Sequence, residues 1–233
     1  MPECTGIESL LNMCLIRRYG GVNTMTDAAM HTPEKKAAEK PRRVRREPEV
    51  ARKLILDAAE QVMRDEGYAA VSTRRVAKDA GLAPALVHYY YPLTDDLFVA
   101  LHQRMTDRQV EDLHTVMASE NPVEALWNYQ TAWTSASLGV EFIALANHRK
   151  SIREKIARRT EQARMEQAEL LAQHFRQSSA LPEAVTPASL AAALTGLART
   201  IVNEQSIGIT CGHDGMRALV DWAIDLLTNR PGQ

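Results

Sequence analysis

Residues 72–97 constrain the fold more than any other stretch, because they place a hydroxyl cap, a glycine turn and a proline in the order that two short helices require. Ser72 can cap a first helix through its hydroxyl, and Gly81 has the backbone freedom that a helix C-terminus needs. Pro84 suits the first turn of a second helix, where its missing N–H is not needed. The stretch therefore predicts a helix-turn-helix whose second helix runs from Pro84 to about Tyr91.

The second predicted helix has side chains suited to reading DNA. In a helix-turn-helix, the second helix enters the major groove and offers its N-terminal residues to base edges, while the first crosses the phosphates. Small apolar side chains at its start can contact thymine methyl groups. The residues expected to face DNA are Pro84, Ala85, Leu86, His88, Tyr89 and Tyr90. The alternative is that a tyrosine-rich helix is ordinary core whose hydroxyls find hydrogen-bond partners.

The Ala80-Gly81-Leu82 turn, the aromatic run at 88–91 and the following Pro92-Leu93-Thr94-Asp95-Asp96-Leu97 resemble the tetracycline-repressor (TetR) family of bacterial transcription regulators. The similarity of motif covers about residues 50–105. It implies that Thr73 touches a phosphate and that Arg74 contacts a phosphate or a base. Thr94 stands where the family usually has a phosphate-touching lysine, so this position of the expected interface loses one backbone contact.

The resemblance also implies an all-α fold with two domains. A three-helix helix-turn-helix DNA-binding domain would cover residues 48–93, and a helical effector-binding and dimerisation domain would cover 94–233. Apolar residues at helical spacing predict the remaining helices. Their ranges are 49–66, with Val50 on the apolar stripe; 94–117, capped by Thr94; a helix from Asn121 onward; 140–148, after an interruption at Gly139; 152–177; 187–207; and 214–228.

Residues 1–47 have no sustained periodicity, which predicts a disordered extension. The natural start could be Met25 or Met30. The densest basic cluster of the chain lies at 40–46, and Arg45 and Arg46 are expected to follow the DNA phosphates or the adjacent minor groove. The alternative is a solvated tail. Basic residues outnumber acidic ones in 40–94, and the reverse holds in 95–233, which suits one phosphate-facing domain.

The last two predicted helices are apolar over wide faces, and we expect them to form a two-fold, four-helix dimer interface. The interface residues would be Leu190, Leu194, Leu197, Ile201, Leu219, Trp222, Ala223 and Leu226. Such a homodimer would present two helix-turn-helix units to two half-sites of a palindromic operator. The alternative is that both apolar stripes pack entirely within one chain.

A small-molecule pocket is implied by the resemblance more than by the residues. Apolar walls with a few polar anchors are typical of such pockets. The candidate lining residues are Trp127, Trp133, Phe142, His148, His174 and Asn203, although aromatics at this spacing also suit ordinary core. An apolar effector is expected because few buried charges are visible, and Glu141 could instead receive a cation.

Catalytic and metal-binding motifs do not emerge from the sequence. Cys211 and His213 fall short of a zinc pattern, and neither a phosphate loop nor a nucleophile elbow is present. Three cysteines are too few for a disulfide framework, which favours a cytoplasmic protein. No apolar stretch is long enough to span a membrane, and no cofactor or membrane contact is expected. The sequence thus predicts a repressor that releases its operator when a small-molecule effector binds. The rivals are an all-helical enzyme or binding protein without DNA binding, and a helical scaffold.

Overall fold

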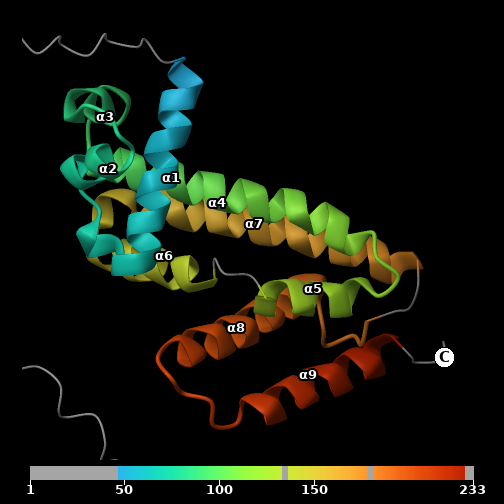
Figure 1. The fold of residues 1–233 in the computed structure, drawn as a ribbon. Helices are drawn as coiled ribbons and strands as arrows, with labels where there is room; N and C mark the ends of the chain where they lie inside the picture. Colours follow the sequence, from blue (N-terminus) through green and yellow to red (C-terminus); the bar gives the residue numbers. More distant parts are fainter. Residues whose placement is uncertain (1–46, 133–135, 178–180, 229–233) are drawn as a thin grey trace, which may run out of the picture. The chain divides into compact units, whose positions relative to one another are not determined.

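The computed structural model describes residues 47–132, 136–177 and 181–228, and these residues form helices with no strand among them. The predicted all-α fold is therefore confirmed for this part of the chain (Figure 1). In chain order the elements are α1 (Pro48–Glu66), the short 3-10 helix η1 (Tyr68–Ala70), α2 (Thr73–Asp79), α3 (Pro84–Tyr90), α4 (Thr94–Met117), α5 (Pro122–Ala132), α6 (Ala136–His148), α7 (Lys150–Gln177), α8 (Pro187–Ser206) and α9 (His213–Thr228).

The helix-turn-helix forms from α2 and α3, as the sequence predicts. Ser72 Oγ accepts a hydrogen bond of 3.2 Å from the backbone N–H of Arg75 and so caps α2. Gly81 has a φ of 62°, a conformation that costs glycine little because it lacks a β-carbon. Helix α3 ends at Tyr90, and the next residue, Tyr91, is its C-cap and is buried in the core.

Two details of the predicted helix starts are wrong. Thr94 does not cap α4, because it lies inside the helix; the carboxylate of Asp96 instead accepts a hydrogen bond of 3.2 Å from the backbone N–H of Leu93. Val50 is 49% exposed and does not belong to the buried stripe of α1. Helical periodicity identifies the apolar face of a helix, but it cannot show where the neighbouring helices stop covering that face.

Gly139 does not interrupt the helix before α7, because α6 begins at Ala136 and runs through it. A glycine in a helix costs only about 1 kcal/mol relative to alanine, which tertiary packing can offset. The guanidinium of Arg199 from α8 lies against this glycine, where an added β-carbon would be 3.8 Å from Nε and Nη2. The glycine therefore gives a neighbouring helix close access to α6.

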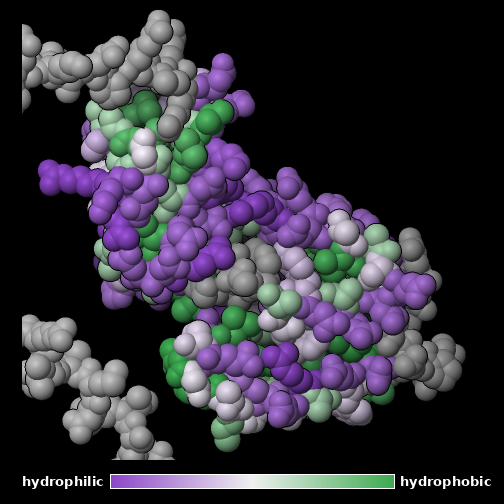
Figure 2. Space-filling model, in the orientation of Figure 1, coloured by the Kyte–Doolittle hydropathy of each residue, from purple (hydrophilic) through white to green (hydrophobic). Residues whose placement is uncertain are grey.

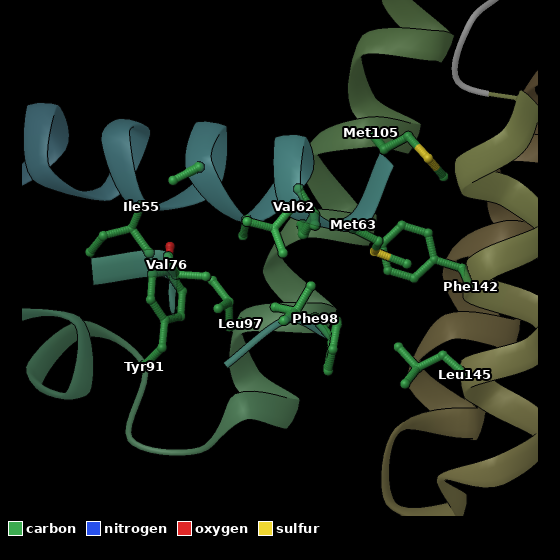
Figure 3. Packing of buried hydrophobic residues seen from close by; sticks show 14 of the residues in the cluster. Ile55, Val62, Met63, Val76, Tyr91, Leu97, Phe98, Met105, Phe142 and Leu145 are labelled. Atoms are coloured by element: carbon green, nitrogen blue, oxygen red, sulfur yellow. The ribbon is translucent and has the colours of Figure 1, made fainter. Parts of the chain in front are cut away.

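Two hydrophobic clusters hold the helices together. The first is built by α1, α2, α3, the first half of α4, α6 and the start of α7, and Figure 3 shows Phe142 of α6 pointing towards Met63 of α1. The second lies among α5, the end of α7, α8 and α9. Helices α4 and α7 run side by side and connect the two clusters (Figure 1). The first cluster crosses the predicted boundary between residues 93 and 94, so the helix-turn-helix shares its core with α4 and α6.

Candidate DNA-binding surface and ligand cavity

The outer face of α3 presents most of the residues that the sequence predicts to read DNA. Pro84, Ala85, His88 and Tyr89 are exposed, with Tyr89 at 76%, whereas Leu86 and Tyr90 are half-buried. Val87 points the other way and is fully buried in the core. The rings of Tyr89 and Tyr90 make a T-shaped contact with 5.2 Å between their centroids. The guanidinium carbon of Arg52 lies over the Tyr90 ring, 5.2 Å from its centroid. The helix therefore has one packed face and one outward face.

The start of α2 contains two arginines, of which Arg75 forms ion pairs and Arg74 forms none with the described residues. Arg75 pairs with Glu66 at 2.6 Å and with Asp79 at 2.8 Å, and these acids raise its pKa above the ordinary value, Asp79 first. Arg74 is exposed and makes no ion pair within the described residues. Thr73, the first residue of α2, and Thr94, the first residue of α4, are both half-exposed. Arg45 and Arg46 lie outside the described residues.

A buried carboxylate fastens α1 to α4. Glu60 of α1 accepts hydrogen bonds from Arg104 and Arg108 of α4, both at 2.6 Å, and from Arg64 of its own helix at 2.7 Å. Arg104 also donates to Asp57 at 2.6 Å. Because Glu60 is only 9% exposed, these charge-assisted bonds are partly shielded from water. These bonds hold α1, which packs against α2, in place on α4.

Helix α6 makes a second connection to the helix-turn-helix. The carboxylate of Glu141 accepts a hydrogen bond of 2.8 Å from the backbone N–H of Tyr68, in the turn between α1 and α2. This contact uses one oxygen of the carboxylate that the sequence suggested as a possible cation receptor. The ring of His148 stacks on that of Tyr68, with 6.5 Å between centroids. Asp95 of α4 bonds to Ser151 and Arg149, and both contacts lower the pKa of its carboxyl, Ser151 most.

A cavity of about 110 Å³ lies among α4, α5, α6, α7 and α8. Of the predicted lining residues, Phe142 is on its wall. Trp127 is buried in the second hydrophobic cluster, His148 is exposed against Tyr68, and His174 and Asn203 lie elsewhere on α7 and α8. Trp133 lies outside the described residues. These four described positions therefore do not line this cavity, because helical spacing does not reveal where helices leave a gap.

The sequence analysis missed the polar residues of the cavity, which come mainly from α4 and α7. His102 is 4% exposed, and burial, with Arg159 as a second cause, lowers the pKa of its imidazole to about 4. Its ring meets Phe142 edge-on with 4.9 Å between centroids, and its Nε2 lies 3.3 Å from Thr160 Oγ1. The imidazole is therefore neutral at pH 7. Arg164 and Arg199 also line the cavity, and no pattern along the sequence marks either of them.

The predicted dimer residues separate into two groups. On α8, Leu190, Leu194 and Ile201 are buried within the chain, and Leu197 is half-buried. On α9, Leu219, Trp222 and Leu226 are 58%, 61% and 41% exposed, and Ala223 is half-exposed. Leu190, Leu194 and Ile201 are therefore not available to a partner, because α8 packs against α5 and α7 of its own chain. Figure 2 shows further hydrophobic surface near the α8–α9 turn, where Ile207 and Ile209 are exposed.

Other chemistries find little basis in the described residues. They contain no group of three or more His, Cys, Asp or Glu side chains that could hold a metal ion. Cys211 is an exposed free thiol, while His213 is buried with its Nε2 at 2.8 Å from Glu204. Among the same residues, no helix has both the length and the hydrophobicity to cross a membrane.

The outward-facing helix α3 packs with α1, α2 and α4, and helices α4–α8 line a cavity. This arrangement defines a helix-turn-helix joined to a candidate ligand-binding body. Residues 55–101 match the model of the family described as "Bacterial regulatory proteins, tetR family". This stretch, which contains α2, α3 and the start of α4, is therefore similar to the corresponding part of that family.

Individual similarities agree with this assignment. The chain is 34% identical over 76 residues to the HTH-type transcriptional regulator BetI of Rhizobium meliloti (strain 1021), a match that covers 32% of this chain and 37% of that protein. A protein from Saccharomonospora viridis solved in complex with choline shares the fold with a TM-score of 0.59 and 22% identity, over 75% of this chain and 95% of that one. The transcriptional regulator FadR of Bacillus subtilis in complex with stearoyl-CoA gives a TM-score of 0.52 and 18% identity, over 76% and 97%.

Proposed function

We propose that this protein is a homodimeric transcriptional repressor that leaves a palindromic DNA operator when a small molecule enters the cavity. The observation that carries the proposal is the 76% exposure of Tyr89 on a helix whose opposite face, at Val87, is fully buried. A side chain of this size projecting from the second helix of a helix-turn-helix is placed where base edges would be read. The protein would act in the cytoplasm, on double-stranded DNA.

Within this proposal, each part of the surface has a separate task. Pro84 and Ala85 at the start of α3 contact bases by apolar surface, and the polar ends of His88 and Tyr89 form hydrogen bonds. Arg74 binds a phosphate or a guanine, which its freedom from acidic partners favours. Leu86, Tyr90, Thr73 and Thr94 support the contact from the edge of the surface, and Arg45 and Arg46 extend it along the backbone.

The second copy of the chain would pack against α9. Leu219, Trp222 and Leu226 are spaced by three and four residues and so form one stripe of the helix. Three large exposed hydrophobic side chains in a row are unusual for a surface that faces only water. A two-fold contact through this stripe would bury it and would hold two α3 helices at the spacing of two operator half-sites.

The cavity can communicate with the helix-turn-helix through α6. Phe142 lines the cavity and also packs in the hydrophobic cluster that contains Met63 of α1. The preceding residue, Glu141, holds the turn after α1 through the backbone N–H of Tyr68. A ligand that displaces the Phe142 ring would therefore shift α6 against α1. If the ligand binds more tightly to the shifted state, it favours a dimer whose reading helices no longer match the operator.

A DNA-binding titration with Tyr89→Ala tests the proposal. Fluorescence anisotropy on DNA from upstream of the gene, at fixed salt, should show preference for this DNA over random DNA, and the variant should reduce that preference about tenfold or more. Met165→Ala truncates a 65% exposed side chain on α7 and should leave it unchanged. Thermal stability and dimer size should be equal in both variants. A Tyr89→Ala protein that unfolds, or that keeps its DNA preference, would support a helical binding protein without DNA reading instead.

A further inference from the structure

The cavity contains two positive charges that no carboxylate of the described residues neutralises. Arg164 of α7 and Arg199 of α8 both line it, and neither forms a hydrogen bond or ion pair with any described residue. None of the other lining residues is Asp or Glu. The short stretches 133–135 and 178–180, which the structure does not describe, contain no Asp or Glu in their sequence either. The cavity therefore has a net positive wall.

This arrangement is unfavourable for the empty protein. The pKa of Arg199 is lowered from its ordinary value, mainly because burial removes water from the guanidinium and also because Arg164 carries the same charge. Another arginine of the same region, Arg159, is by contrast paired with Asp107 at 2.7 Å. A partly buried charge without a counter-ion contributes nothing to stability. The two guanidinium groups could therefore bind an anion, because no carboxylate of the described residues pairs with them.

The remaining lining residues describe the other end of such a ligand. Met105, Phe142 and Ile156 provide apolar walls. The side-chain Nε2 of Gln167 and Oε1 of Gln130 are buried in the same cavity without hydrogen-bond partners, so a donor and an acceptor are also free. The volume of about 110 Å³ is of the same order as the roughly 150 Å³ of dry cavities that accept benzene, so the apolar part of the ligand is compact.

We propose that the cavity binds a small organic anion: a carboxylate or phosphate group, held by Arg164 and Arg199, on a compact apolar body that packs against Phe142. The inference rests on the proposed function only in treating this cavity as the effector site. It replaces the apolar effector expected from the sequence, because the two arginines come from different helices and meet only in the folded chain. Hydrogen bonds from the two guanidinium groups to an anion would be charge-assisted and therefore stronger than bonds to a neutral group.

Titration calorimetry with matched probes tests the proposal without DNA. Benzoate, phenyl phosphate and benzamide share one ring and differ in the charge and shape of the head group. At least one of the two anions should bind about tenfold or more tightly than neutral benzamide. Tighter binding of benzoate identifies a carboxylate site, and tighter binding of phenyl phosphate identifies a phosphate site. The proposal is overturned if benzamide binds as tightly as the anions, or if neither anion binds up to its solubility limit.

Substitutions assign the binding to these residues. Arg199→Gln should weaken the bound anion about tenfold or more, whereas Arg176→Gln, on an exposed arginine of α7 paired with Glu169, should not. Arg199→Met should raise the melting temperature of the ligand-free protein, because it removes a partly buried charge that has no acidic partner among the described residues. A lower melting temperature would identify Arg199 as a structural residue and contradict the proposal. If the anion binds but DNA affinity is unchanged, the repressor mechanism fails while the ligand class stands.

Discussion

Gly67→Ala is the substitution whose cost can be worked out most directly from the structure. Gly67 ends α1 with a φ of 79° and a ψ of 169°, a conformation that is open almost only to glycine and costs other residues about 1–3 kcal/mol. A β-carbon at this position would also lie 3.3 Å from the carboxylate oxygen of Glu141. Moving that carboxylate would weaken its bond to the N–H of Tyr68, at a further cost of about 1–3 kcal/mol.

The two costs can be separated by urea denaturation of a double-mutant cycle. Gly67→Ala should lower the free energy of unfolding by about 2–6 kcal/mol in the normal chain. In a Glu141→Ala background the carboxylate is already absent, so Gly67→Ala should cost only the backbone part, about 1–3 kcal/mol. Equal costs in the two backgrounds would refute the argument that Glu141 holds the turn between α1 and α2.

The remaining predictions concern a buried imidazole and the exposed stripe of α9. His102 has its pKa lowered from an ordinary 6.5 to about 4, so the unfolded chain takes up the proton first. Stability should therefore be full above about pH 6.5 and fall by about 3 kcal/mol as the pH drops towards 4; urea titrations should show a flatter pH profile for His102→Gln, and an unchanged profile would contradict the assignment. If α9 forms the proposed dimer, Trp222→Glu should convert it to a monomer in analytical ultracentrifugation, whereas Asp221→Lys, on the adjacent position outside the stripe, should leave it dimeric. A Trp222→Glu protein that stays dimeric would place the interface elsewhere.

The helix-turn-helix could be predicted from the sequence because its signals are local. The cap by Ser72, the turn at Gly81 and the start of α3 at Pro84 depend on neighbours within a few residues, and all three are found in the structure. Tyr91 was assigned to the end of this helix because it continues an aromatic run. Its burial comes from the hydrophobic cluster that α1, α2 and α4 also build, and no local pattern records how these helices pack.

The candidate cavity was largely inaccessible to sequence reasoning. Phe142 was identified as an aromatic on a helix, but Trp127 has the same signature and packs in the second hydrophobic cluster. Arg164 and Arg199 look along the chain like ordinary helical surface charges. They become a pair only because α7 and α8 pack against each other. The same reasoning explains α8, whose apolar stripe could face a partner or the chain's own α5 with equal periodicity.

The sequence by itself determined the helical class, the position of the helix-turn-helix and its similarity to a known family, because hydrophobic periodicity, helix caps and turn residues act between near neighbours. The tertiary structure alone decided which apolar faces are covered, that the reading unit shares its core with α4 and α6, and which charges lack a counter-ion. These properties depend on distances between residues far apart in the chain, such as the 2.8 Å between Tyr68 N and Glu141. No periodicity along the chain encodes them, because they result from how whole helices pack.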